Sequence, residues 1–420
     1  MKVCVIGSGG REHALAWRLS ISPSVTKVYA IPGSAAMSDC AELVGIDWQQ
    51  SDHLISFLKD NQVDLVVVGP EAPLVAGLAD VLNKVGIPVF GPSKAAAQLE
   101  GSKVFAKNLM KKYNIPTAAY GVFHKVDEAK TFIAQTGAPI VVKADGLAAG
   151  KGVVVAMTVD EANEAVEDML SGNRFGDAGS TVVIEEFMEG EEASLLAFVD
   201  GKTVVPMIAS QDHKRIFDGD KGANTGGMGT YAPAPVLTDA LRDEAMKTIL
   251  EPMVAAMEKE GMPYVGCLYA GLMITDEGPK VVEFNARFGD PETQVVLPLL
   301  DSDLGQIMMA CATGTLTADM VKWKDSSAAC VILASKGYPE TSSKGDVISG
   351  DIKQYDTTIV FHSGTKLVGE NYVTNGGRVL GVVGLGKDLR TALDRAYGRI
   401  EHIDFEGMQY RTDIGAKAFK

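Results

Sequence analysis

The sequence predicts a multidomain protein of the α/β and α+β classes, with an N-terminal open parallel sheet and a small C-terminal α+β domain. Over the first hundred residues, short apolar runs alternate with amphipathic stretches, as strands alternate with helices in such a sheet. From residue 118 onward, apolar runs flank glycine-rich turns, which is typical of an α+β unit. At roughly 100–200 residues per domain, a chain of 420 residues holds about two to four domains.

In the first part, apolar runs and helical periodicity define the elements in order. Strands are expected at 3–6, 27–31, 65–68 and 89–91. Helices are expected between them at 13–20, 53–59 and 74–85. A basic helix over 103–113 follows and ends before Pro116.

In the remainder, strands and helices are more closely mixed. Strands are expected at 140–144, 153–156, 181–186, 194–198, 204–208 and 328–334, with a hairpin of 270–274 and 280–284. Helices are expected at 158–171, 238–261 and 389–400. A stretch rich in Gly, Asp and Asn, 217–229, predicts a loop without regular structure.

Charge and composition exclude several classes of function. With 39 Lys+Arg against 54 Asp+Glu the net charge is −15, and the pI is near 4.9. Nucleic acids and acidic membranes need a cationic surface, so we expect neither as a partner. The five cysteines form no CxxC pair, and no long apolar run suits a membrane span. Because Met1 leads directly into a strand without a signal-peptide pattern, we expect a cytoplasmic protein.

The first glycine-rich loop, Gly7 to His13, joins the first strand to the first helix. Free N–H groups at a helix start attract an anion, so Gly9 and Gly10 are candidates for binding a phosphate. A dinucleotide fingerprint fits poorly, since Glu12 replaces its third glycine and no acid ends the second strand. A smaller phosphate ester is favoured. The alternative is a turn that only packs the helix on the strand.

A second candidate at the same sheet edge is Glu71, in the sequence Gly-Pro-Glu-Ala-Pro-Leu after the third strand. Its carboxylate could accept hydrogen bonds from sugar hydroxyls or from an amine. It could equally be an acid favoured by the dipole of the helix that it begins. Both interpretations stay open at this point.

The glycine-rich loop after Lys143 is the strongest local signal. It is not a Walker A loop, because three residues separate its first two glycines, Gly146 and Gly150, and Gly152 stands where Ser or Thr should follow Lys151. A glycine lid between two strands, with lysines beside it, suits closure over the phosphates of ATP. The alternative is an ordinary glycine hairpin.

The strand that follows about forty residues later could complete a nucleotide site. Its apolar residues and the acids after them suit an adenine slot, with one acid on the ribose hydroxyls. The candidates are Glu185, Glu186, Phe187 and Glu192.

Glu283, Asn285 and Arg287 alternate at the end of a strand, so they share one face. Carboxylate and amide oxygens are hard ligands suited to Mg²⁺ bound with nucleotide phosphates. The guanidinium suits a substrate carboxylate, held in a bidentate clamp. A solvent-facing strand edge would also show polar alternation.

Residues 210–215 bring together an acid, an imidazole and two cations. The pair of Asp212 and His213 invites a hydrolase interpretation, but no G-x-S-x-G motif supplies a nucleophile. No HExxH motif supports a zinc site.

Together these motifs resemble the ATP-grasp superfamily and, within it, the phosphoribosylamine–glycine ligase family. The matching segments run in order along nearly the whole chain. They are GSGGREH, GPEAPL, KADGLAAGKGV, SQDHKR, NTGGMG, EFNARFGDPETQ and the C-terminal YRTDIG. One departure is that Ala-Gly-Leu at 270–272 stands where many ATP-grasp proteins carry a second metal-binding carboxylate.

The resemblance implies that ATP, glycine and 5-phosphoribosylamine give glycinamide ribonucleotide, ADP and phosphate through a glycyl phosphate, in purine synthesis. It implies Mg²⁺ or Mn²⁺ at Glu283 and Asn285, and catalytic roles for Lys143, Arg287 and Asp212. The nucleotide would contact Lys103, Lys143, Gly150, Lys151, Gly152, Glu185, Glu186, Phe187 and Glu192. The two other substrates would contact Gly9, Gly10, Glu71, Asp212, Lys214, Arg287, Gly289, Asp290 and Pro291.

The resemblance also implies three domains. These are a phosphoribosylamine-binding domain at 1–100, an ATP-grasp domain at 101–325 with a lid at about 118–190, and a C-terminal domain at 326–420. We expect a stand-alone monomer, with a dimer as the alternative. The rival functions are an ATP-grasp ligase acting on another purine intermediate or on bicarbonate, a Rossmann-type dehydrogenase, and a nucleotide sensor without turnover.

Overall fold

The N-terminal part is an open parallel sheet, as the sequence predicts. The computed structural model describes residues 1–147, 152–171 and 180–419. The sheet order is β3-β2-β1-β4-β5, and every neighbouring pair is parallel. Its strands are β1 (Lys2–Gly7), β2 (Lys27–Pro32), β3 (Glu42–Leu43), β4 (Leu65–Val68) and β5 (Val89–Phe90). Its helical segments are α1 (Gly10–Ser20), η1 (Ala35–Asp39), α2 (Ser51–Asp60), α3 (Glu71–Ala76) and α4 (Leu78–Lys84). The single helix expected over 74–85 is thus wrong, because Gly77 takes a left-handed conformation, with φ +96°, that divides it.

Two short helices, α5 (Gln98–Gly101) and α6 (Lys103–Lys112), lead to a small α+β unit. Its sheet has the order β6-β9-β7-β8. The strands are β6 (Tyr120–Phe123), β7 (Ile140–Ala144), β8 (Val153–Ala156) and β9 (Val182–Glu186), and the helices are α7 (Val126–Thr136) and α8 (Val159–Ser171). Helix α7 was not predicted from the sequence. Apolar residues of both helices and of the sheet share one core.

A four-stranded antiparallel sheet, β11-β10-β16-β17, occupies the centre of the molecule. Its strands are β10 (Glu191–Asp200), β11 (Val204–Pro206), β16 (Val265–Thr275) and β17 (Gly278–Asn285). The helical segments of this part are α9 (Asp239–Ala245), η3 (Met246–Leu250), α10 (Glu251–Lys259), α11 (Thr293–Leu299), α12 (Leu304–Thr313) and η4 (Ala318–Met320). The helix expected over 238–261 is interrupted by the π-helical turn η3.

The C-terminal sheet has the order β12-β15-β18-β23-β20 and is covered by α13 (Leu389–Ile400). Its strands are β12 (Gln211–Asp212), β15 (Gly229–Ala232), β18 (Ser327–Ala334), β20 (Thr358–His362) and β23 (Arg378–Gly386). Strands β12 and β15 therefore come from the middle of the chain. They pair with each other, and β15 also pairs with β18, which lies about a hundred residues later.

Smaller elements complete this part. A hairpin of β13 (Arg215–Phe217) and β14 (Lys221–Asn224) forms where the sequence predicted an irregular loop over 217–229. Gly219, with φ +70°, lies in its turn, so glycine content alone was a poor guide. The others are β19 (Ser349–Gly350), β21 (Thr365–Val368), β22 (Asn371–Thr374), β24 (Ile403–Asp404) and η5 (Ala416–Phe419).

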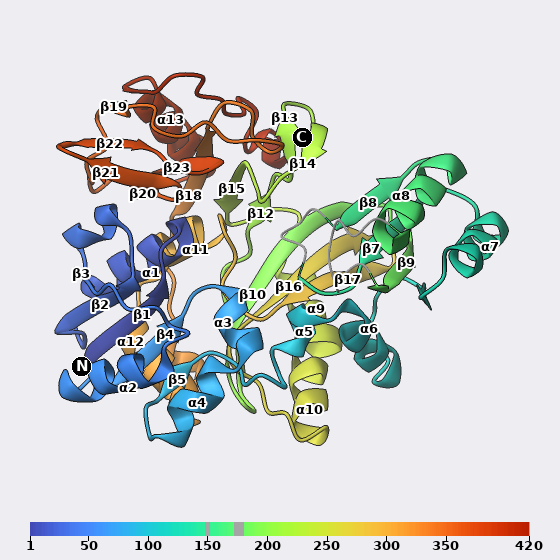
Figure 1. The fold of residues 1–420 in the computed structure, drawn as a ribbon, viewed down its shortest axis with the longest axis horizontal. Coiled ribbons are helices and arrows are strands. Elements are labelled where there is room, and N and C mark those ends of the chain that lie inside the picture. Colours follow the sequence, from blue (N-terminus) through green and yellow to red (C-terminus); the bar gives the residue numbers. More distant parts are fainter. Residues whose placement is uncertain (148–151, 172–179, 420) are drawn as a thin grey trace.

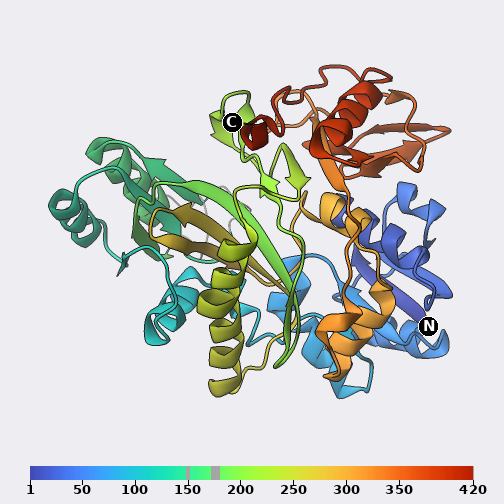
Figure 2. The same ribbon diagram turned by 180° about the vertical axis from the view of Figure 1, so that it is seen from behind.

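Three bodies surround the central sheet in Figure 1: the parallel sheet in blue, the small unit of α7 and α8 projecting to the right, and the C-terminal sheet in red. Figure 2 shows α10 and α12 on the reverse side. No helix within the described ranges is long and apolar enough to span a membrane. The five cysteines are free thiols, and four of them are buried.

Candidate active site

Three lysines converge on Glu283, near the end of β17. The lysines come from separate segments, with Lys103 at the start of α6, Lys143 on β7 and Lys214 after β12. Burial would raise the pKa of Glu283, but these lysines and Arg287 lower it below its ordinary value. An ionised carboxylate beside the Asn285 amide oxygen is a hard donor set, so these two residues fit Mg²⁺ or Mn²⁺.

Lys143 is held by one buried carboxylate. Its Nζ lies 2.9 Å from Glu185 Oε2 and donates to the Val282 carbonyl at 3.0 Å. The other oxygen of Glu185 lies 3.4 Å from Nζ of Lys107, a residue that the sequence analysis missed. Burial lowers the pKa of Lys107 to about 8, although Glu185 opposes the shift. Glu185 thus joins two lysines beside β17, and its carboxylate is not free in this arrangement.

The start of the glycine loop is anchored to the first turn of α6. Lys103 Nζ donates to the Gly146 carbonyl at 3.0 Å, and the Asp145 carboxylate accepts from the Val104 backbone at 3.2 Å. At the far end of the loop, the Gly152 carbonyl accepts from Ala144 at 2.8 Å. The expected nucleotide contacts at Gly150 and Lys151 lie outside the described residues.

The remaining nucleotide candidates lie at the edge of the small sheet and in a cavity on the central sheet. Glu186, exposed at the end of β9, accepts weakly from the Ala119 backbone at 3.4 Å, and Phe187 is half-buried. Glu192 at the start of β10 lines a small cavity together with Glu283, Asp212 and Lys214.

Arg287 has protein acceptors on all three of its nitrogens. Nη2 lies 2.7 Å from Glu100 Oε1 and 3.4 Å from Asn285 Oδ1, and Nε donates to Glu71 Oε2 at 3.4 Å. Nη1 donates to the Phe288 carbonyl at 3.3 Å. A bidentate clamp on a substrate carboxylate therefore requires at least one of the longer contacts to be released. Glu71 is the most accessible of these partners, with 32% of its side chain exposed.

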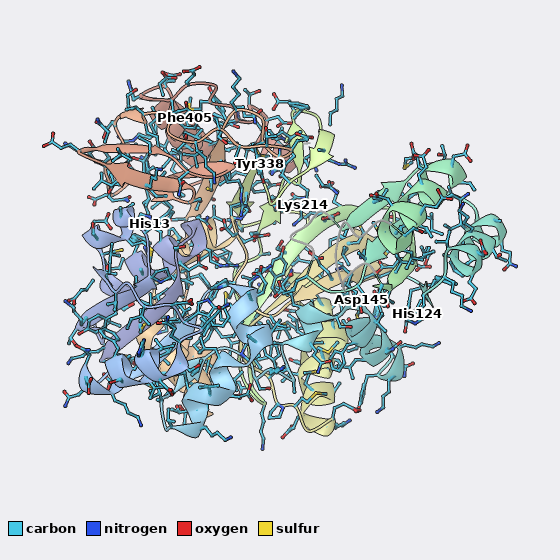
Figure 3. All side chains as sticks on the ribbon, in the orientation of Figure 1. His13, His124, Asp145, Lys214, Tyr338 and Phe405 are labelled. Atoms are coloured by element: carbon cyan, nitrogen blue, oxygen red, sulfur yellow. The ribbon has the colours of Figure 1, made fainter. Side chains whose placement is uncertain are left out.

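Lys214 lies in the space between the central and C-terminal sheets (Figure 3). It forms an ion pair with Asp212. Their Oδ2 and Nζ atoms lie 3.1 Å apart, and the Asp212 side chain is 3% exposed. Glu292 is also buried and accepts from the Tyr269 hydroxyl at 2.7 Å. Burial raises the pKa of both acids, and the charge of Asp212 raises that of Glu292 further. Burial therefore favours the protonated form of each acid relative to an exposed carboxyl group.

His213 does not act with Asp212 as a catalytic pair. Its Nδ1 lies 3.1 Å from the Gly229 carbonyl, and its Nε2 accepts from the Gly415 backbone N–H at 3.4 Å. Both ring nitrogens are occupied by backbone, and burial lowers the pKa of His213 to about 4. The hydrolase interpretation therefore has no support in this geometry.

Glu12 occupies the start of α1. Its carboxylate accepts from the Gly9 amide at 2.7 Å and from Arg11 Nε at 2.5 Å, and only 3% of the residue is exposed. A Cβ on Gly69 would lie 2.2 Å from Glu12 Oε1. The Glu12 side chain therefore occupies the space between Gly69 and the N-terminus of α1. One amide expected to receive a phosphate is thus already bonded, and the arrangement leaves a dinucleotide little room.

A cavity of about 570 Å³ adjoins this loop at the carboxyl edge of the parallel sheet. Its lining includes Gly9 and Pro70, and also Asp47 and Trp48 from a segment that was not predicted to belong to the site. Gly10 faces elsewhere, because a Cβ there would lie 2.3 Å from Oγ of Ser363 in the C-terminal part. Gly10 is thus a close contact between two parts of the chain.

The turn 289–292 lies against the C-terminal sheet. Asp290 Oδ1 accepts from Gln294 Nε2 at 2.8 Å, and its carbonyl accepts from Arg378 Nη1 at 2.8 Å. Gly289 is packed on Glu292, and Pro291 is packed on the loop at Gly227.

The structure therefore groups the candidates into two regions, one around Glu283 and one between the first glycine-rich loop and the turn 289–292. Around Glu283 lie Lys103, Lys143, Lys214, Asp212, Glu192, Asn285 and Arg287. Gly9 and Asp290 approach each other, since a Cβ on Gly9 would lie 3.9 Å from Asp290 Oδ2. The site residues predicted from the sequence do not include Glu100, Lys107, Arg378 and Ser363. Of these four, only Lys107 could have been found from local pattern, because it lies one helical turn after Lys103 and so on the same face of the helix.

Comparison with known proteins identifies the family. Models described as phosphoribosylglycinamide synthetase N domain, ATP-grasp (A) domain and C domain match residues 1–100, 101–293 and 328–417. The phosphoribosylamine–glycine ligase of Halalkalibacterium halodurans is 53% identical over 418 residues, covering 100% of this chain and 97% of that protein. That of Neisseria meningitidis serogroup A is 53% identical over 420 residues, covering 100% and 99%.

Solved structures agree with this assignment. The phosphoribosylamine–glycine ligase of Thermotoga maritima superposes with a TM-score of 0.87 at 34% identity, covering 99% of this chain and 100% of that one. The biotin carboxylase domain of the Hydrogenobacter thermophilus 2-oxoglutarate carboxylase, crystallised with MgADP and bicarbonate, has a TM-score of 0.75 at 16% identity. It covers 97% of this chain and 91% of that one, and at this identity it shows the fold alone. With matches to all three domain models and relatives at 53% identity over the full chain, this protein belongs to the phosphoribosylamine–glycine ligase family and has the ATP-grasp fold.

Proposed function

We propose that this chain ligates glycine to 5-phosphoribosylamine at the expense of ATP, giving glycinamide ribonucleotide, ADP and phosphate in purine biosynthesis. The observation that carries the proposal is the convergence of Lys103, Lys143 and Lys214 on the ionised Glu283, next to Asn285 and Arg287. Cations gathered around a hard metal-ligand pair suit a bound nucleoside triphosphate.

The first step activates glycine, because a free carboxylate is a poor acyl donor. A carboxylate oxygen of glycine attacks the γ-phosphorus of ATP, the bond to the β-phosphate oxygen breaks, and ADP leaves. Lys143 and Lys103 stabilise the charge on the transferred phosphoryl group. Glu283 and Asn285 would hold Mg²⁺ or Mn²⁺, and the ion would supply positive charge to offset that of the phosphates.

Arg287 holds the glycine carboxylate in line for this transfer. Because its nitrogens already face protein acceptors, the incoming carboxylate replaces the long contact to Glu71. The pKa of Glu71 is lowered, since Arg287 and Arg11 outweigh the effect of its burial. Glu71 is therefore ionised and suited to bind an amine after its release.

The second step forms the amide. The amine of phosphoribosylamine attacks the carbonyl carbon of glycyl phosphate, and inorganic phosphate leaves. Asp212 accepts the proton that the amine loses, a role suited to a carboxylate whose pKa is raised by burial. Lys214, paired with Asp212, lies beside the same reacting groups.

The phosphoribosyl group lies in the cavity beside Gly9 and toward Asp290 and Pro291 of the turn. The Gly10 position supports this region through its contact with Ser363.

We also propose that the protein acts in the cytoplasm, where its free cysteines stay reduced, and that it is a monomer.

The test is ADP release by the purified protein with Mg²⁺, with glycine and freshly generated phosphoribosylamine added separately and together. Release that needs both substrates supports the proposed reaction. Release that needs bicarbonate instead, or ATP binding without turnover, would contradict it and favour one of the rival functions.

A further inference from the structure

Glu100 lies outside every set of candidate residues, yet its carboxylate contacts two neighbouring residues of the active site. Oε1 lies 2.7 Å from Arg287 Nη2, and Oε2 accepts from the Ala286 backbone N–H at 2.8 Å. Ala286 stands between the metal-ligand candidate Asn285 and Arg287. One carboxylate thus holds both the guanidinium and the backbone that carries it.

This contact is better shielded from solvent than the other acidic contact of Arg287. The Glu100 side chain is 7% exposed, whereas that of Glu71 is 32% exposed and its distance to Arg287 is 3.4 Å. Burial raises the pKa of Glu100 even against the charge of Arg287, so the carboxylate depends on that cation to stay ionised. Glu100 is therefore the fixed partner of the pair of acids and Glu71 the exchangeable one.

The position of Glu100 in the chain connects it to the nucleotide end of the site. It lies in α5, which packs against β17 and leads directly into α6. Within three residues come Ser102, whose Oγ lies 3.3 Å from both oxygens of Asp145, and Lys103, which bonds to Gly146. The same short segment therefore supports Arg287 and the start of the glycine loop.

We infer that Glu100 is a positioning residue for the glycine-binding step: it fixes Arg287 and the Ala286 amide so that the guanidinium meets the glycine carboxylate in line with the transferred phosphoryl group. The inference rests on the proposed function, because it acts through the role given there to Arg287. Glu100 itself touches no reacting atom.

Two variants test the inference in the full-length protein. Glu100→Gln keeps the size of the side chain and removes its charge, and Glu100→Asp keeps the charge but withdraws it by one methylene. We expect Glu100→Gln to raise the glycine KM at least tenfold, and Glu100→Asp to raise it less. The dissociation constant of MgADP, measured without glycine by titration calorimetry, should change less than twofold.

Asp351→Asn is the matched control, because Asp351 forms a pair of similar length with Arg399, 2.6 Å, in the C-terminal part. It should leave the glycine KM unchanged. A glycine KM within twofold of wild type in folded Glu100→Gln would overturn the inference. An equal rise in the KM values of all three substrates would also overturn it, and so would loss of the folded state in both Glu100 variants. Each of these results would show that Glu100 supports the structure in general and does not specifically position Arg287.

A double-mutant cycle separates this inference from the function on which it rests. If Glu100 acts through Arg287, the glycine KM of the double variant Glu100→Gln, Arg287→Ala should equal that of Arg287→Ala alone. Effects that multiply would show that Glu100 acts independently and would overturn the inference. An Arg287→Ala variant with unchanged glycine KM would instead contradict the proposed role of Arg287.

Discussion

The Arg378 guanidinium, at the start of β23 in the C-terminal sheet, binds both the backbone carbonyl and the side-chain carboxylate of Asp290. Asp290 lies in the turn after β17. Nη1 donates to the Asp290 carbonyl at 2.8 Å, and Nη2 lies 3.4 Å from Asp290 Oδ2. The same Nη1 donates to the Gly226 carbonyl at 2.7 Å. The C-terminal part therefore fixes two loops at the edge of the active site.

We expect Arg378→Ala to raise the KM for phosphoribosylamine about tenfold, because the Asp290 turn loses its support. Leaving the buried Asp290 without its cation should also lower the free energy of unfolding by about 3 kcal/mol. Steady-state kinetics with freshly generated phosphoribosylamine and denaturant unfolding measure the two effects. Arg395→Ala is the control, since Arg395 makes an exposed contact with the Leu385 carbonyl in the same part. A normal KM in Arg378→Ala would refute this role.

Glu283→Gln should remove turnover without unfolding the protein. The amide keeps the shape of the side chain but loses the charge that lies among the three lysines and that would bind the metal. We expect kcat to fall about a thousandfold, which is about 4 kcal/mol of transition-state stabilisation. ADP release across a titration with Mg²⁺ and then Mn²⁺ gives the measurement. Activity that excess metal fully restores would show weakened binding alone, and normal activity would contradict the metal role.

Glu185→Gln should weaken both nucleotide binding and the fold. Its carboxylate lies between the buried lysines Lys143 and Lys107, and without it their charges face each other unbalanced. We expect the free energy of unfolding to fall by about 3 kcal/mol and the KM for ATP to rise several-fold. Glu167→Gln is a suitable control, because its pair with Lys130 is exposed on the small unit. Unchanged ATP kinetics in Glu185→Gln would contradict the positioning of Lys143 by this acid.

Two buried histidines should make the fold sensitive to acid. Burial lowers the pKa of His213 to about 4 and that of His362 to about 3, from an ordinary value of 6.5. The unfolded chain then binds protons that the folded chain does not, so their contribution is fully present above pH 6.5. It is lost as the pH falls from 6.5 toward these values.

Each histidine should add about 1.4 kcal/mol per pH unit to the slope of unfolding free energy against pH in that range. His213→Gln should reduce the slope by that amount between pH 4.5 and 6, while replacing the exposed His53 should not. Denaturant unfolding at a series of pH values provides the test. An unchanged slope in His213→Gln would show that His213 is not buried in its neutral form.

Local pattern was sufficient for the parts of the site that lie within one element. The alternation at the end of β17 predicted that Asn285 and Arg287 are neighbours, and their side chains are 3.4 Å apart. The break of the third helix at Gly77 depends on a single left-handed residue, which periodicity does not reveal. The strands that were predicted could be located from local pattern, because each is a short apolar run.

Contacts between distant segments could not be predicted in this way. Glu100 and Ala286 are 186 residues apart, and Arg378 and Asp290 are 88 apart. Nothing in the neighbourhood of either charged residue indicates its partner, because the contact depends on how the sheets pack. The two mid-chain strands of the C-terminal sheet, β12 and β15, were missed for the same reason.

The claim that glycine is activated by phosphoryl transfer is tested most directly with glycine labelled with ¹⁸O in both carboxylate oxygens. The reaction is run with ATP, Mg²⁺ and phosphoribosylamine, and the released phosphate is analysed by mass spectrometry. If a glycine oxygen attacks the γ-phosphorus, one ¹⁸O per turnover appears in the phosphate. Phosphate without ¹⁸O, released together with glycinamide ribonucleotide, would show that glycine is not phosphorylated and would contradict the mechanism.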